Sequence, residues 1–198
     1  MPDCRLPSAP PEARRAGAPA AANPARRALL ALPLLMLSCG RAKSPPPAVV
    51  GLPRVLDRRR TLPDWLGEIR DPDGIIRQTL LAPYPIATLV QHGFTEGLER
   101  RGELALDAPP RLDLSIEIHR FECIAVLRLD AAADLDLVLS EAGSGRERDR
   151  QRALRNFAAP LPVGEGATAT ALRQMSRELL DAVVKEGLDA PRFRAGLA

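Results

Sequence analysis

Two neighbouring stretches decide the fold: "LDLSIEIHRFEC", residues 112–123, and "LRLDAAADLDLVL", residues 127–139. In both, apolar residues alternate with polar or charged ones. A period of two predicts β-strands with one face buried and the other in contact with water or a partner. Phe121 and Cys123 lie on the opposite parity from Leu112 and its successors, so a bulge or strand break is expected near His119 and Arg120.

Further strands flank this pair. Residues 49–56, "VVGLPRVL", predict a first strand that is interrupted or at a sheet edge, because Pro53 cannot donate to a β-ladder. A turn at residues 143–145 should lead into another strand over residues 147–157. Four arginines would then project from one side of that strand, as a charged edge or as a site for acidic lipid headgroups: Arg146, Arg148, Arg150 and Arg152.

Two segments have helical periodicity. Apolar residues recur at steps of three and four over residues 86–101, where Gly102 follows as a cap, and again over 168–186, where Gly187 is expected to end the helix. Gly93 and Gly97 fall on the inward face of the first helix. We interpret them as positions where that helix approaches the sheet closely.

The predicted order is strand, helix, three strands, helix. Helices separated from a run of antiparallel strands are typical of the α+β class. We therefore expect one α+β domain over residues 49–198, with an antiparallel sheet of about four strands and both helices on one face. Residues 57–74, "DRRRTLPDWLGEIRDPDG" from Asp57 to Gly74, are expected to be a long loop that ends in a turn at 71–74.

The first 38 residues read as a signal peptide. Arg26 and Arg27 precede an apolar run from Ala28 to Leu37, which is too short for a membrane-spanning helix and has the length of a signal-peptide core. The preceding residues, rich in Ala, Pro and Arg, cannot order themselves by burial and indicate an over-long start. Residues 39–48 are expected to be a tether, stiffened by three consecutive prolines.

The run ends at Met36-Leu37-Ser38-Cys39-Gly40, which resembles a bacterial lipobox. That resemblance implies a thioether-linked diacylglycerol and a fatty acyl chain on Cys39, and no other cofactor. An ordinary signal peptide with an incidental cysteine, and a buried cytosolic helix, remain as alternatives. Since Gly40 replaces the aspartate that retains lipoproteins in the inner membrane of enteric bacteria, the outer membrane is favoured, with the domain facing the periplasm.

The charge, the cysteines and the histidines of the chain argue against several classes of function. The formal charge of +3 comes entirely from residues 1–38, so nucleic-acid binding is not expected. With Cys4 in the leader and Cys39 acylated, Cys123 is left alone and should be a buried, inert thiol. His92 and His119 are the only histidines, so no metal site is predicted, and His119 should be a solvated surface residue. No phosphate-binding loop or nucleophile elbow is present, which argues against an enzyme.

The segment around Trp65 is the one candidate contact site. It contains the only tryptophan of the chain, flanked by Arg58 and Arg70. Trp65 is expected either to cap the core or to anchor a partner or lipid, with the arginines binding anions.

The arrangement resembles the YajG-type family of small bacterial lipoproteins. The matching stretches are the Leu-Ser-Cys-Gly lipobox, "VLDRRRTLPDWLGEIR", "PIATLVQHGFTEGLERRG", the two central strands and "LRQMSRELLDAVVKEGLD". More distantly, it is similar to the auxiliary lipoproteins of envelope lipid-transport ABC systems and to the lipopolysaccharide-assembly lipoprotein. The resemblance implies no catalytic residues.

We therefore expect a non-enzymatic envelope lipoprotein, held on the membrane by lipid and acting as an accessory or scaffold to a protein complex of the cell envelope. The alternative is a periplasmic protein that binds a lipid or small ligand between its helices and its sheet. The partner and the oligomeric state are open at this stage.

Overall fold

The strands at the centre of the computed structural model are long and paired as the sequence pattern requires. The structure describes residues 49–164 and 166–198, which belong to one compact unit, Lys43–Ala198. The expected signal peptide, Cys39 and the tether lie outside the described residues. Strands β4 (Leu112–Ala125), β5 (Leu129–Glu141) and β6 (Glu147–Ala159) form an antiparallel meander. The predicted strand at 147–157 is thus confirmed.

The predicted bulge is present. The register of β4 against β5 shifts between Ile118 and Arg120, so His119 has no partner opposite it. This extra residue turns Phe121 and Cys123 to the face that Ile118 occupies, and all three are buried. The bulge therefore keeps a continuous apolar face along a strand whose sequence changes parity.

The expectation of one long loop over 57–74 was wrong in part: residues 58–64 and 71–74 lie outside strands, but residues 65–70 form one. Strands β2 (Trp65–Arg70) and β3 (Ile76–Leu81) form a hairpin around the turn at 71–74, and β1 (Arg54–Asp57) begins directly after Pro53. Val50 makes only isolated bridges to Leu104 and Leu112, so the first strand is interrupted as Pro53 predicts.

The sheet therefore has six strands rather than about four, in the order β3-β2-β4-β5-β6, with β1 also on β4. It is also not purely antiparallel. Both β1 and β2 run parallel to β4, where β1 pairs with Ser115–Ile118 and β2 with Cys123–Ala125. Parallel strands need a crossover connection between them. Here the chain supplies it by running from β3 through the first helix to β4.

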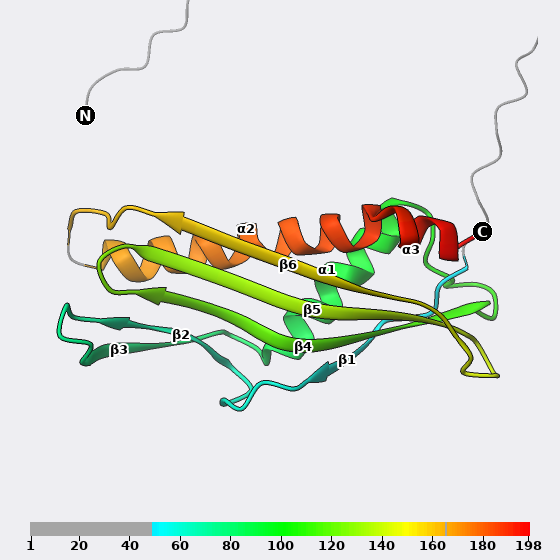
Figure 1. The fold of residues 1–198 in the computed structure, drawn as a ribbon, viewed down its shortest axis with the longest axis horizontal. Coiled ribbons are helices and arrows are strands. Elements are labelled where there is room, and N and C mark those ends of the chain that lie inside the picture. Colours follow the sequence, from blue (N-terminus) through cyan, green and yellow to red (C-terminus); the bar gives the residue numbers. More distant parts are fainter. Residues whose placement is uncertain (1–48, 165) are drawn as a thin grey trace, which may run out of the picture. The chain divides into compact units, whose positions relative to one another are not determined.

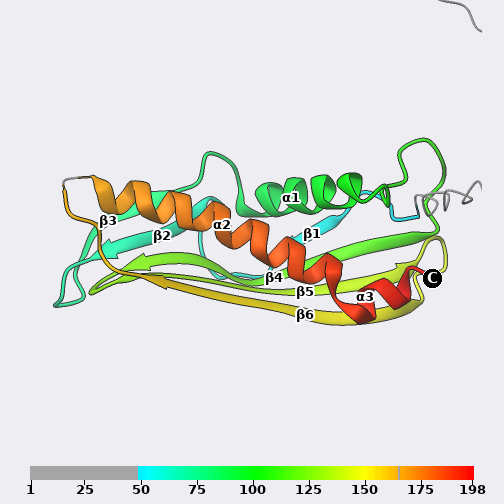
Figure 2. The same cartoon turned by 90° about the horizontal axis from the view of Figure 1, so that it is seen from above.

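Three helices cover one face of the sheet (Figure 2): α1 (Ile86–Arg100), α2 (Ala167–Asp189) and the short α3 (Pro191–Gly196). The two long helices and their shared face are as predicted. Gly187 does not end α2. It lies inside the helix, where an added Cβ would approach Leu137 to 2.8 Å, and the short α3 buries Phe193.

The glycines of α1 have a different role from the one expected. A Cβ at Gly97 would lie 2.7 Å from Leu188 Cδ1 and 2.8 Å from Val184 Cγ1, and one at Gly93 would lie 3.3 Å from Leu180. All three neighbours belong to α2. The small residues therefore allow close contact between the two helices, not between helix and sheet.

Figure 1 shows the order of the strands and the place of β1 and β2 along β4. Among residues 49–164 and 166–198, no helix combines the length and the apolar content that a membrane span needs.

Candidate functional site: an apolar pocket beside the Arg59 junction

The two short strands β1 and β2 follow one another along the same edge of β4. β1 pairs with residues 115–118 of β4 and β2 with residues 123–125, which leaves a gap between the two short strands. Phe121 lies in the stretch of β4 beside this gap, and its carbonyl oxygen faces it. Arg59 fills this gap. Its Nη1 donates to the carbonyl oxygens of Phe121 (3.0 Å) and Trp65 (2.9 Å), and its Nη2 to that of Pro63 (3.2 Å).

Asp57 holds the same guanidinium in place. Its carboxylate accepts hydrogen bonds from Nε and Nη2 of Arg59 at 3.0 and 2.8 Å, and the Arg59 side chain is only 4% exposed. Sequence reasoning selected the neighbour Arg58 and missed Arg59. The only signal was a run of three arginines before a Pro-Asp turn, and nothing local distinguishes the buried one.

The three predicted contact residues lie around this junction but not together. Arg58 is exposed and donates to Glu117 at 3.2 Å on the polar face of the sheet. Arg70 is at the far end of β2, where it pairs with the buried carboxylate of Glu68. Trp65 is partly buried at the start of β2. Arg70 thus neutralises a buried acid, and its role as a partner contact stays a prediction.

An apolar pocket of about 150 Å³ lies beside Leu66 and Phe121, on the helical side of the β2–β3 hairpin. Its walls come from the hairpin and the following residues, from α1, from β4 and from α2. The lining residues are Leu66, Leu81, Ala82, Pro83, Leu89, Phe121, Arg173, Ser176, Arg177 and Leu180. Most of this surface is apolar, while the two arginines are exposed on successive turns of α2.

Three structural features together give the pocket its apolar lining. The bulge turns Phe121 inward, the hairpin brings Leu66 and Leu81 beside it, and the contact at Gly93 sets α1 against Leu180. The pocket can hold an apolar group, with its two arginines available for an anion. No residue of the pocket is placed for nucleophilic or acid–base chemistry, because its only hydroxyl, Ser176, donates to the carbonyl of Arg173.

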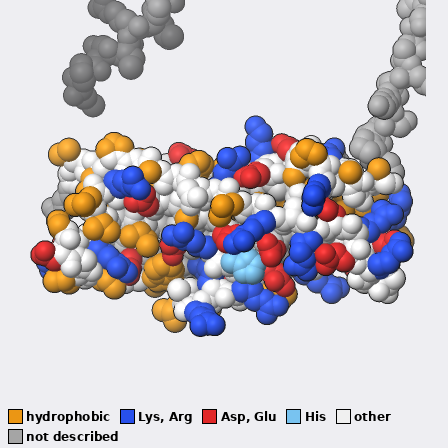
Figure 3. Space-filling view, viewed as in Figure 1, with side chains coloured by type: hydrophobic (Ala, Val, Ile, Leu, Met, Phe, Trp, Pro, Cys, Tyr) orange, Lys and Arg blue, Asp and Glu red, His pale blue; other side chains and the backbone are white. Residues whose placement is uncertain are grey.

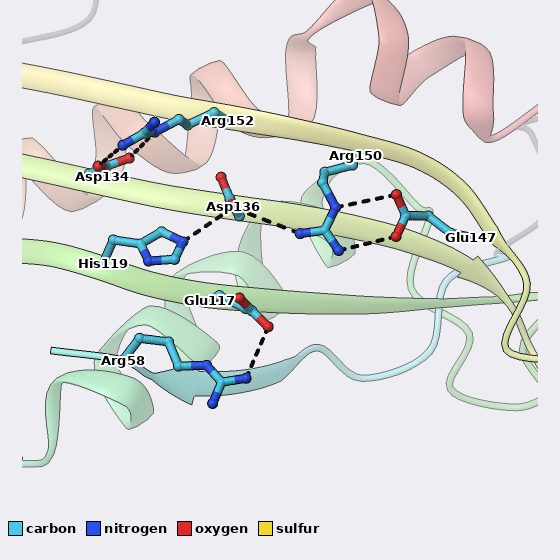
Figure 4. Close-up of polar contacts among 8 residues, drawn as sticks. All are labelled: Arg58, Glu117, His119, Asp134, Asp136, Glu147, Arg150 and Arg152. Carbon is cyan, nitrogen blue, oxygen red and sulfur yellow. Dashed lines mark hydrogen bonds and ion pairs between the residues drawn. The ribbon is translucent and has the colours of Figure 1, made fainter.

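The opposite face of the sheet carries a network of ion pairs (Figure 4). His119 Nε2 lies 3.2 Å from Asp136, which also lies 3.8 Å from Arg150, and Arg150 pairs with Glu147. Figure 3 shows acidic and basic side chains interspersed over this face, with apolar side chains gathered toward the end that holds the β2–β3 and β4–β5 turns.

Glu117, His119 and Asp136 could each offer one ligand atom to a metal ion, since these atoms lie within 4.8 Å of one another. Both carboxylates, however, already contact guanidinium groups, Glu117 that of Arg58 and Asp136 that of Arg150. A cation would have to displace two arginines. We interpret the group as part of the charge network, and the absence of a metal site stays a prediction.

Ion pairing also perturbs acids elsewhere on the sheet. The hydrogen bond from Arg152 lowers the pKa of Asp134, and that from Arg146 lowers the pKa of Glu141. All four arginines predicted on β6 and its preceding turn are paired with acids, so the charged-edge interpretation fits better than a free site for lipid headgroups.

Cys123 is buried, and burial raises the pKa of its thiol to about 12, as expected for an inert cysteine.

No protein-family model matches the chain, and no curated protein matches it. Among solved structures, protein XCC0632 from Xanthomonas campestris, of the family DUF330, is 19% identical with a TM-score of 0.49 over 72% of this chain and 86% of that chain. A candidate lipoprotein from Caulobacter crescentus is 18% identical with a TM-score of 0.42, over 52% and 78% of the two chains.

Lipoprotein GNA1162 from Neisseria meningitidis is 9% identical, with a TM-score of 0.38 over 67% of this chain and 98% of that chain. These are distant likenesses of fold. Assignment to the YajG-type family stays a prediction from the sequence.

Proposed function

We propose that this chain is a non-enzymatic lipoprotein of the bacterial cell envelope, tethered through acylated Cys39 and acting as an accessory or scaffold of an envelope complex. The anchor is supported by the apolar run that ends in Met36-Leu37-Ser38-Cys39-Gly40. We place the domain on the periplasmic side, and favour the outer membrane because Gly40 follows the cysteine.

The size of the apolar pocket supports the accessory role over lipid carriage. A cavity of about 150 Å³ is comparable to one that admits benzene, whereas sites for drug-sized ligands occupy roughly 300–1,000 Å³. A two-chain lipid would therefore have to lie mostly outside it. The pocket is better matched to one side chain of a protein partner.

Metabolic labelling with a palmitate analogue tests the anchor. The Cys39→Ser variant should lose the label and move from the membrane to the soluble periplasmic fraction, because a serine cannot form the thioether. The matched control is Cys4→Ser, which removes a cysteine of the leader and should keep both label and membrane location. Label retained by Cys39→Ser would contradict the proposal.

Native mass spectrometry tests the accessory role against the alternative of a lipid-binding lipoprotein. The Cys39→Ser protein, released from the periplasm without detergent, should have the mass of its polypeptide alone. A stoichiometric non-covalent lipid would instead support the binding role, for which the apolar lining of the pocket is the favouring observation.

A further inference from the structure

The two outer edges of the sheet differ in chemistry. On β6, arginines stand at alternate positions and each pairs with an acid: Arg148 with Glu141, Arg150 with Asp136, and Arg152 with Asp134. Arg148 Nη1 also donates to the carbonyl of Gly196 in α3. Charge on an edge strand opposes the addition of a further strand.

The β3 edge has little of this protection. Among the described strands β3 pairs with β2 alone, so its outer edge lacks a strand partner. Ile76 is 51% exposed and Leu81 is 48% exposed, and the one charged residue of β3, Arg77, is paired with Asp71 of the turn. Free backbone groups beside exposed apolar side chains favour strand addition.

The unprotected edge leads into the pocket. Leu81, the last residue of β3, lines the pocket together with Ala82 and Pro83. The pocket is also lined by Arg173 and Arg177, which lie one helical turn apart on α2, and neither has an ion-pair partner among the described residues. An extended segment lying along β3 would therefore meet an apolar hole and two cationic groups at one end.

We propose that the β3 edge and this pocket form a docking site for an extended, acidic segment of a partner protein. The segment adds as a strand beside β3, inserts one apolar side chain into the pocket and places a carboxylate against Arg173 and Arg177. This inference rests on the proposed accessory role and names the kind of partner segment that it requires.

Two observations select a peptide over an acyl chain as the occupant. The pocket has room for a group about the size of benzene, which matches a phenylalanine or leucine side chain. The adjacent β3 edge offers backbone hydrogen bonds, which an extended peptide can use and a hydrocarbon chain cannot. The rim arginines supply charge complementarity for an acidic sequence.

Binding of a designed probe tests the site. The probe is a fluorescent peptide of alternating threonine and valine with a central phenylalanine next to two aspartates, titrated by anisotropy against the full-length Cys39→Ser chain. Without detergent or an attached acyl chain, neither of these can compete for the pocket. Failure of lipidation would not affect this experiment, so it is independent of the anchor test.

Saturable binding is expected, with slower hydrogen exchange confined to β3 and the pocket. Reversing both rim charges in Arg173→Glu/Arg177→Glu should weaken binding by about tenfold or more and favour a probe with lysines in place of the aspartates. The control Arg100→Glu/Arg192→Glu makes the same change in net charge on exposed helical residues outside the pocket and should bind as the parent does.

Four results would overturn the inference. One is equal affinity for the probe in the parent and the rim variant, and a second is protection that maps away from β3. The third is a probe with alanine in place of phenylalanine that binds as tightly as the original. Displacement of the probe by dodecanoate, with no protection of β3 by the peptide, would assign the pocket to acyl chains instead.

Discussion

Replacing Arg59 with alanine should destabilise the domain more than any other single arginine substitution around the β1–β2 junction. The Arg59 side chain is 4% exposed and donates to the carbonyls of Phe121, Trp65 and Pro63 as well as to the Asp57 carboxylate. Its loss leaves part-buried carbonyls without a donor and Asp57 without its counter-ion.

The magnitude follows from these contacts. Hydrogen bonds from a charged donor contribute about 1.5–3 kcal/mol each, and removing one partner of a buried ion pair costs about 3–5 kcal/mol. We take about 4 kcal/mol as the expected loss in the free energy of unfolding. Because each kcal/mol shifts the midpoint by about 2–4 °C in a chain of this size, a fall on the order of 10 °C is expected.

Arg58 provides the matched control on the neighbouring residue. Its side chain is 55% exposed and has one hydrogen bond, to Glu117 at 3.2 Å. Exposed pairs of this kind contribute about 0.2–1 kcal/mol, so Arg58→Ala should leave the midpoint within about 3 °C of the parent.

Thermal and urea unfolding, followed by circular dichroism and by Trp65 fluorescence, measure both variants. Trp65 reports the junction directly, since its own carbonyl binds Arg59. An Arg59→Ala midpoint within 3 °C of the parent, or equal effects of the two substitutions, would refute the reasoning that Arg59 closes the gap between β1 and β2.

Three further predictions concern single residues of the sheet. Gly67→Ala should cost at least about 3 kcal/mol in urea denaturation, because a Cβ there would lie 1.7 Å from the backbone oxygen of Cys123; a stable variant would contradict this close approach. Cys123, whose thiol pKa burial raises to about 12, should react with iodoacetamide at mildly alkaline pH only after unfolding, as mass spectrometry would detect, and modification of the native protein would contradict it. Arg152 lowers the pKa of Asp134 below its ordinary value of 3.8, so their pairing adds stability above that pH and loses it as the pH falls through the lowered pKa. Arg152→Met should therefore be less stable than the parent at neutral pH and nearly equal to it in strong acid, and urea titrations with equal deficits at both pH values would argue against this pairing.

Local patterns predicted the central part of the fold. Three- and four-residue spacing located α1 and α2 closely, and the change of parity located the bulge at His119, because both signals arise within one element and need no knowledge of its neighbours. The residues on either side of Asp71-Pro72-Asp73-Gly74 predict a hairpin only weakly. Gly67 and Glu68 obscured the pattern because both are buried although neither is a large apolar residue: Gly67 lies against Cys123, and Glu68 pairs with Arg70.

By itself, the sequence determined where the long strands and helices lie, that they form an α+β domain, and that a lipobox-like stretch precedes it. Tertiary structure alone decided the parallel pairing of β1 and β2 with β4, the burial of Arg59 rather than Arg58, and the pocket beside β3. These features depend on contacts between residues far apart in the chain, such as the bond from Arg59 to Phe121. Which of three adjacent arginines meets an unpaired carbonyl is set by strand register, and register is fixed only when the strands pair.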